Sequence, residues 1–257
     1  MVQRVLTHPC RLSLLLLAGA CSGGPADRGA PEGSIGVTVV SDGWQLIGDL
    51  VRGSPAASAP AVLLLNQAGG ARAAYAPLAG ALARRGIASL RIDLRGHGES
   101  VNLGAFVPGE ADALDLLKGT EHDVAAALSF LAHSAGIDST RIAVVGASYS
   151  GEIAVLATRR ERPAQAYVLL SPGSLSAASV EWLDRLDAPW LFVASRLERM
   201  RAVRDVIEMV LKSARRADVV LLARPSGHAT DLLENHPGLA EQLAAWLSAR
   251  LQPPRED

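Results

Sequence analysis

Short apolar runs alternate along this chain with longer segments of helical periodicity. From residue 35 onward, the runs have the length of strands and consist mainly of Val, Ile, Leu and Ala. Continuous apolar runs of this length are typical of parallel strands that are buried on both faces. Six such runs occupy residues 61–66, 87–93, 141–146, 166–171, 190–194 and 218–223.

The beginning of this region has a different pattern. Residues 35–40 and 44–51 alternate apolar and polar positions around the turn residues Asp42 and Gly43. Alternation on both sides of an Asp-Gly pair predicts an antiparallel hairpin. Together with the six apolar runs, the hairpin gives a mostly parallel sheet of eight strands.

Helical segments lie between the predicted strands. Residues 76–86 and 120–136 have helical periodicity and each ends in glycine, a common helix stop. A final amphipathic segment, residues 237–251, is expected to pack on the sheet. Strands that alternate with helices predict an α/β fold with helices on both faces of the sheet. A chain of 257 residues fits one such domain, which we place at residues 35–251.

Composition and charge exclude some partners. Hydrophobic residues make up 49% of the chain and charged residues 20%, which is ordinary for a globular protein. The formal net charge is -1, and no block of like charges occurs. Because nucleic-acid binding needs a basic patch, we expect no nucleic-acid partner.

The first residues predict export. Arg4 and Arg11 precede an apolar run at residues 12–20, the arrangement of a signal peptide. The run is shorter than the roughly 20 apolar residues that span a bilayer. We therefore expect residues 1–20 to be a signal peptide and the polar, glycine-rich residues 21–34 to be a flexible tether.

Two cleavage patterns fit the end of this signal peptide. The stretch LAGAC resembles a bacterial lipobox and would place a lipid on Cys21, although Ala18 stands where leucine is usual. The small residues from Ala18 to Ala20 also fit ordinary secretory cleavage. We favour a lipid-anchored protein of the bacterial cell envelope, with a secreted or periplasmic soluble protein as the alternative. With Cys10 inside the leader, the domain has no cysteine for a disulfide or a metal site.

The segment GASYSG, residues 146–151, is the strongest chemical signal. It follows a predicted buried strand and precedes a helix, which is the context of a nucleophile elbow with Ser148 as nucleophile. The strained turn needs small residues two positions before and after the serine. Gly146 meets this requirement, and Ser150 stands where the usual pattern has a second glycine.

A base and an acid follow Ser148 in the order that this kind of site uses, serine, then acid, then histidine. His228 follows the last predicted strand and is the candidate base, ahead of His97 and His236. Glu198 follows the strand at 190–194 and is the candidate acid that orients the imidazole. The acid alternatives are Asp187 and Asp205.

Acyl transfer also requires donors for the oxyanion. The backbone N–H of Tyr149, directly after the nucleophile, is one candidate. The second is expected from the loop NQAGG after the strand at 61–66, contributed by Ala68 or Gln67.

Three segments carry a family resemblance: GASYSG, SGHAT and IDLRGHGES at residues 92–100. With them, residues 35–250 resemble an α/β hydrolase of the small dienelactone-hydrolase-like or esterase-like kind. The resemblance implies the α/β-hydrolase fold and a serine hydrolase acting on an ester-like small molecule without a cofactor. It assigns Ser148 as nucleophile, His228 as base and Glu198 as acid, with Ala68 and Tyr149 as oxyanion donors. His97 is usually structural in this family.

Other readings of the sequence differ in class. A dinucleotide-dependent reductase is disfavoured because the loop after the first parallel strand lacks GxGxxG. A metal-dependent hydrolase is disfavoured because no histidines or carboxylates have ligand spacing. A non-catalytic envelope protein that keeps the fold as a binding module stays open. Residues 172–189 are too few for a large cap, whereas residues 101–119 form either a small cover or a plain surface loop.

Overall fold

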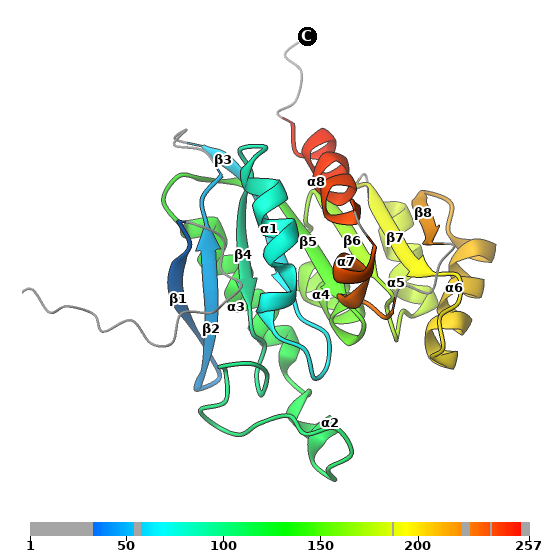
Figure 1. Ribbon diagram of the computed structural model, residues 1–257, viewed down its shortest axis with the longest axis horizontal. Helices are drawn as coiled ribbons and strands as arrows, with labels where there is room; N and C mark the ends of the chain where they lie inside the picture. The colour runs from blue at the N-terminus through cyan, green and yellow to red at the C-terminus, as the bar shows by residue number, and fades with distance from the viewer. Residues whose placement is uncertain (1–32, 54–57, 187, 223–226, 237, 253–257) are drawn as a thin grey trace, which may run out of the picture.

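One eight-stranded sheet runs through the molecule in the order β1-β2-β4-β3-β5-β6-β7-β8 (Figure 1). The computed structural model describes residues 33–53, 58–186, 188–222, 227–236 and 238–252. The strands are β1 (Ile35–Ser41), β2 (Trp44–Val51), β3 (Ala59–Leu65), β4 (Ala88–Ile92), β5 (Ile137–Ala147), β6 (Ala166–Leu170), β7 (Trp190–Ser195) and β8 (Ala217–Leu222). Strand β2 is antiparallel to both of its neighbours, and all other neighbouring pairs are parallel. The predicted mostly parallel sheet of eight strands is thus confirmed.

The predicted hairpin is formed by β1 and β2. Ser41 pairs with Trp44 across a two-residue turn. Both turn residues have positive φ, 48° at Asp42 and 82° at Gly43. This is the turn that matches the twist of paired strands, and Asp and Gly tolerate it better than most residues.

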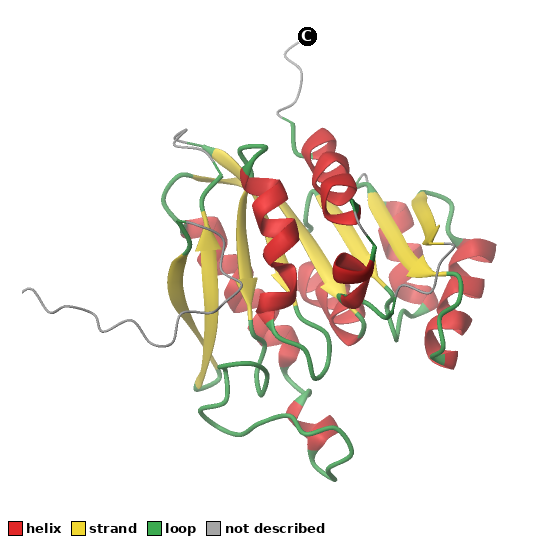
Figure 2. Cartoon of the chain, viewed as in Figure 1, coloured by secondary structure: helices red, strands yellow, loops and turns green. Residues whose placement is uncertain are grey.

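Helices cover both faces of the sheet (Figure 2). They are η1 (Arg72–Tyr75), α1 (Ala76–Ala83), α2 (Ala113–Leu116), α3 (Thr120–His133), α4 (Tyr149–Arg160), α5 (Ala177–Arg185), α6 (Arg201–Ser213), α7 (Asp231–Asn235) and α8 (Leu239–Arg250). Helices α1, α7 and α8 pack into one apolar cluster, and α3, α4, α5 and α6 into the other.

Strand β3 shows why the apolar runs are continuous. Leu63 and Leu65 belong to one apolar cluster, while Val62 and Leu64 belong to the cluster on the opposite face. Successive side chains of a strand point to opposite faces, so a strand covered on both sides needs apolar residues at every position.

The prediction of full burial is wrong for β8. This strand lies at the edge of the sheet, and Val219 and Val220 remain 36% and 37% exposed. An edge strand has a neighbour on one side only, so its apolar run does not guarantee cover on both faces. Strand β5 is also longer than expected, because it begins at Ile137.

The connection between β4 and α3 extends beyond the carboxyl edge of the sheet and carries the short helix α2 (Figure 1). Leu103, Val107 and Leu114 are exposed on this excursion. Phe106, in this connection, stacks on His97 with ring centroids 4.9 Å apart, and this contact holds the connection against the domain.

The predictions for the N-terminal segment concern residues that the structure does not describe. The predicted signal peptide at residues 1–20 and the predicted lipid-attachment residue Cys21 lie outside the described residues, as does nearly all of the predicted tether at 21–34. Among the helices that are described, none has both the length and the apolar character needed to cross a membrane.

Candidate active site

Ser148 lies at the sharp turn between β5 and α4. Its backbone has φ 54° and ψ -118°, and a positive φ is uncommon for a residue other than glycine. A β-carbon on Gly146 would lie 2.7 Å from both the Gly151 Cα and the Ser150 carbonyl oxygen. The turn therefore requires glycine at position 146, and the segment has the strand–turn–helix form of a nucleophile elbow.

Three side chains from separate loops meet at the carboxyl edge of the sheet. The Oγ of Ser148 lies 2.8 Å from Nε2 of His228. On the other side of the ring, Nδ1 of His228 lies 3.1 Å from Oε2 of Glu198. Both distances are within hydrogen-bond range, and the chain of contacts is that of a nucleophile, its base and an orienting acid.

The loop after β7 fixes the carboxylate of Glu198. Its Oε1 accepts hydrogen bonds from the backbone amides of Arg199 at 2.9 Å and Met200 at 3.2 Å. The other oxygen, Oε2, is left to face His228. Only 3% of the Glu198 side chain is exposed, so the contact is largely shielded from solvent.

Asp205 and His97 have partners other than Ser148, His228 and Glu198, and Asp187 lies outside the described residues. Asp205 is exposed on α6 and pairs with Arg201 at 3.7 Å. His97 is buried between Phe106 and Tyr149. Its Nδ1 lies 2.8 Å from the carbonyl oxygen of Arg95, and burial lowers its pKa.

His228 lies in a short loop with an unusual backbone. Ala229, the next residue, has φ 50°, which is costly for a residue with a side chain. The backbone amide of His228 donates to Oδ2 of Asp231 at 3.3 Å, and that of Thr230 donates to Oε1 of Gln67 at 2.9 Å. The Thr230 bond connects this loop to the loop after β3.

The candidate oxyanion donors come from two places at the same sheet edge. Tyr149 is the first residue of α4, so its amide has no acceptor within the helix and lies at the positive end of the helix dipole. Ala68 lies in the loop after β3, within a turn that the Gly70 amide closes by donating to the Gln67 carbonyl oxygen at 2.9 Å. The side chain of Gln67 faces Thr230.

Arg72, at the end of the same loop, is held by carboxylates. It contacts Asp93, Glu99 and, at 2.8 Å, Asp49. Burial lowers the pKa of Arg72, but these carboxylates outweigh the effect and raise the pKa above its ordinary value. Burial also raises the pKa of Asp93, which accepts a hydrogen bond from the Arg72 amide at 2.6 Å.

A hollow of about 360 Å³ lies on the Glu198 side of His228, and Ser148 is not among its lining residues. His228 and Glu198 line it together with Leu197, Arg199 and Met200. In the described part of the chain, no three His, Cys, Asp or Glu side chains gather as metal ligands.

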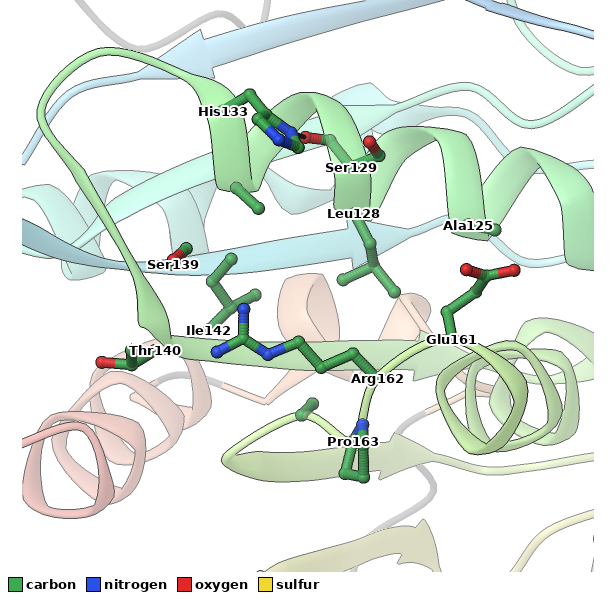
Figure 3. Close-up of a pocket in the computed structure, with 12 residues that line it drawn as sticks. Ala125, Leu128, Ser129, His133, Ser139, Thr140, Ile142, Glu161, Arg162 and Pro163 are labelled. Carbon is green, nitrogen blue, oxygen red and sulfur yellow. Dashed lines mark hydrogen bonds between the residues drawn. The ribbon is translucent and has the colours of Figure 1, made fainter.

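A second hollow, of about 210 Å³, lies at the opposite end of the sheet (Figure 3). Leu128 and Ile142 contribute apolar surface, and Arg162 and His133 line it as well. It lies where β5 begins, far along the strand from Ser148, and none of the three aligned side chains lines it.

Sequence patterns did not reveal two parts of this site. The sequence offers Gln67 only as an oxyanion donor, and its bond to Thr230 joins residues 163 positions apart. Arg72 lies 21 residues from Asp93 and carried no motif of its own. The one available signal was the set of charged residues on otherwise apolar strands, Asp49, Arg91 and Asp93, because buried charges are rarely left without a partner.

Known proteins resemble the chain in sequence and in fold. A family model described as serine aminopeptidase, S33, matches residues 56–224. Two uncharacterized proteins of Mycobacterium tuberculosis, MT2364 and Rv2307c, are each 33% identical over 162 residues, which cover 63% of this chain and 52% of theirs. The chain thus spans about half the length of the curated relatives it matches.

Solved structures share the fold at low sequence identity. The thermophilic carboxylesterase EstE1, cloned from a metagenomic library, is 19% identical with a TM-score of 0.64, covering 89% of this chain and 92% of that one. The dienelactone hydrolase of Anabaena variabilis is 21% identical with a TM-score of 0.60, covering 84% and 95%. XC6422 of Xanthomonas campestris, a serine hydrolase without a lid, is 17% identical with a TM-score of 0.60, covering 88% and 98%.

At these identities the solved structures establish the fold alone. The family model adds a match in sequence that spans well over half of the chain and includes β3, the elbow at Ser148 and the loop of Glu198. The chain therefore belongs to the serine aminopeptidase S33 family and is an α/β hydrolase.

Proposed function

We propose that this hydrolase cleaves a carboxylic ester, thioester or lactone through an acyl-enzyme on Ser148. The observation that carries the proposal is the alignment of Ser148, His228 and Glu198, with contacts of 2.8 Å and 3.1 Å. A serine hydroxyl is a weak nucleophile until an adjacent base accepts its proton. The short contact to His228 supplies that base.

The reaction proceeds in two halves. Ser148 Oγ attacks the substrate carbonyl while Nε2 of His228 takes the hydroxyl proton, and Glu198 stabilises the resulting imidazolium. The amides of Tyr149 and Ala68 stabilise the negative charge on the carbonyl oxygen. His228 then protonates the leaving group. Water activated by the same imidazole attacks the acyl-enzyme, and the acid is released with Ser148 regenerated.

Intact-mass labelling with a fluorophosphonate probe tests the proposal. We expect one adduct per chain on the wild type and none on Ser148→Ala or His228→Ala. Ser129→Ala is the matched control, because Ser129 is an exposed serine of α3 on the hollow remote from Ser148. No adduct on folded wild-type protein would favour the alternative, a binding module of the cell envelope that keeps the fold without catalysis.

The substrate class needs a separate panel. Nitrophenyl esters, thioesters and lactones are compared with aminoacyl nitroanilides, the kind of substrate that the family's description suggests. Ester-like substrates are expected to give the higher kcat/KM. Preferential cleavage of the nitroanilides would contradict the ester proposal while leaving the roles of Ser148 and His228 intact.

We also propose that the chain is exported and anchored in the bacterial envelope through a lipid on Cys21. The support is the sequence LAGAC after a short apolar run. Cys21→Ala is expected to lose lipid labelling and membrane retention in a bacterial host with the lipoprotein pathway. An identical soluble, processed product from both versions would indicate ordinary secretion instead.

A further inference from the structure

Gln67 connects the loop after β3 with the loop that carries His228. Its Oε1 accepts a hydrogen bond from the Thr230 amide at 2.9 Å. Its own backbone lies directly before Ala68, the candidate oxyanion donor. We propose that Gln67 is a positioning residue that sets the distance between the oxyanion donors and His228. This inference rests on the proposed acyl-transfer function.

The loop of His228 needs such a support. Ala229 holds a positive φ of 50°, a conformation that persists only when the surroundings enforce it. Glu198 fixes the imidazole ring through Nδ1, but this contact does not hold the backbone. The backbone is held within the loop by the bond from the His228 amide to Asp231, and it is tied to a separate loop by the bond from the Thr230 amide to Gln67. Thr230 is only 4% exposed, so water is a poor substitute for the lost acceptor.

The other end of the connection is itself held firmly. Nδ2 of Asn66 donates to the Gln67 carbonyl oxygen at 2.9 Å, and Oδ1 of Asn66 accepts from the Leu94 amide at 2.9 Å. A β-carbon on Gly70 would lie 2.9 Å from the Gln67 Cγ, so glycine at position 70 leaves the space that the Gln67 side chain occupies. The two hydrogen bonds of Asn66 hold the backbone at Gln67, which makes its side chain a defined spacer.

The geometry has a catalytic consequence. The base and the oxyanion donors act on atoms of one tetrahedral intermediate, and a displacement of about 1 Å between such groups can cost on the order of 100-fold in rate. Loss of the spacer therefore changes the chemical step more than it changes substrate binding. A residue that only stabilised the fold would not produce this division between kcat and KM.

Two variants of the full-length protein test the inference. Gln67→Met keeps the length of the side chain and removes the acceptor, and we expect kcat to fall about 10- to 100-fold with little change in KM. Gln67→Glu keeps an acceptor oxygen and is expected to restore most of kcat. Its added negative charge near the base favours the protonated imidazole, so the acid limb of its pH–rate profile moves to higher pH. The matched control is Gln242→Met, at an exposed glutamine of α8.

Hydrogen exchange gives a readout that does not need turnover. The Thr230 amide is expected to exchange faster in Gln67→Met than in the wild type or in Gln67→Glu. If the wild type neither reacts with the fluorophosphonate nor turns over esters, the proposed function fails. The exchange rate of the Thr230 amide in Gln67→Met still shows whether Gln67 holds the loop of His228. Wild-type kcat and unchanged Thr230 exchange in Gln67→Met would overturn the inference. So would equal losses of kcat in both variants. If Gln67→Met does not fold, the pH–rate profile of Gln67→Glu is the test. An acid limb at the wild-type position would overturn the inference.

Discussion

The hydroxyl of Ser150 accepts a hydrogen bond from the Ala147 amide at 2.8 Å, bracing the turn that presents Ser148, the proposed nucleophile, between them. The same Oγ lies 2.9 Å from the Ala147 carbonyl oxygen and 3.2 Å from that of Leu65, so its single proton has an acceptor in either direction. Ser150 stands where the usual elbow pattern has glycine. Its hydroxyl satisfies a buried amide that a glycine would leave without this partner.

Restoring glycine at position 150 is therefore expected to harm the enzyme. Ser150→Gly and Ser150→Ala both remove the hydroxyl that the buried Ala147 amide bonds, and the loss of such a partner typically costs about 1–3 kcal/mol of unfolding free energy. Denaturant unfolding measures the loss, with Ser129→Ala as the control at an exposed helical serine. A Ser150→Gly variant as stable as the wild type, with equal or faster fluorophosphonate labelling, would contradict this account.

Replacing the carboxylate of Glu198 by an amide is expected to block proton transfer at His228. The oxygen of Glu198→Gln can still accept from the Arg199 and Met200 amides, which turns the NH₂ group toward Nδ1. Nδ1 must then act as acceptor, so the proton is carried on Nε2, and Ser148 loses its base.

The expected fall in kcat is about 100- to 10,000-fold, measured in an ester assay. The control is Asp205→Asn, which changes an exposed carboxylate that the sequence also offered as a candidate acid. A larger loss in Asp205→Asn than in Glu198→Gln would reassign the acid.

The sequence was informative where one rule acts on neighbouring residues. Burial on both faces demands apolar side chains at every position of a strand, so β3 and the buried second half of β5 could be recognised from their continuous apolar runs. Chain order and loop position were enough to nominate Glu198 and His228. Contacts such as Gln67 with Thr230 join segments that approach only after folding, and no local pattern encodes them. The predicted burial of β8 was wrong for a related reason, because an apolar run does not show whether helices cover both faces of the strand.

Acid is expected to destabilise the protein through His97. Nδ1 donates to the Arg95 carbonyl, which can only accept, and the buried Nε2 has no partner among the described residues. Burial therefore lowers the pKa of His97 in the folded state. As the pH falls, the unfolded chain takes up this proton first, starting near the ordinary value of about 6.5. The stabilisation is complete above that pH and is lost as pH falls toward the folded-state value.

The His97→Asn variant isolates this effect. Asparagine can keep the donor to the Arg95 carbonyl while removing the titrating group. Unfolding free energies measured between neutral and mildly acidic pH are expected to fall less steeply for the variant than for the wild type. Parallel curves would show that His97 does not contribute to the pH dependence.

Neutralising Asp93 is expected to destabilise both the fold and the oxyanion loop. Asp93→Asn removes the negative charge of a carboxylate that contacts the buried guanidinium of Arg72. Breaking a buried ion pair typically costs about 3–5 kcal/mol of unfolding free energy. The lower end applies, because Asp49 and Glu99 still contact Arg72.

The loop that carries Ala68 ends at Arg72, so fluorophosphonate labelling should also slow in Asp93→Asn. Denaturant unfolding and labelling rates are measured together, with Glu208→Gln as the control because the Glu208–Lys212 pair lies on the exposed surface of α6. Such exposed pairs add little to stability. If Asp93→Asn lost stability but kept the wild-type labelling rate, the carboxylate cluster would support the fold without shaping the site.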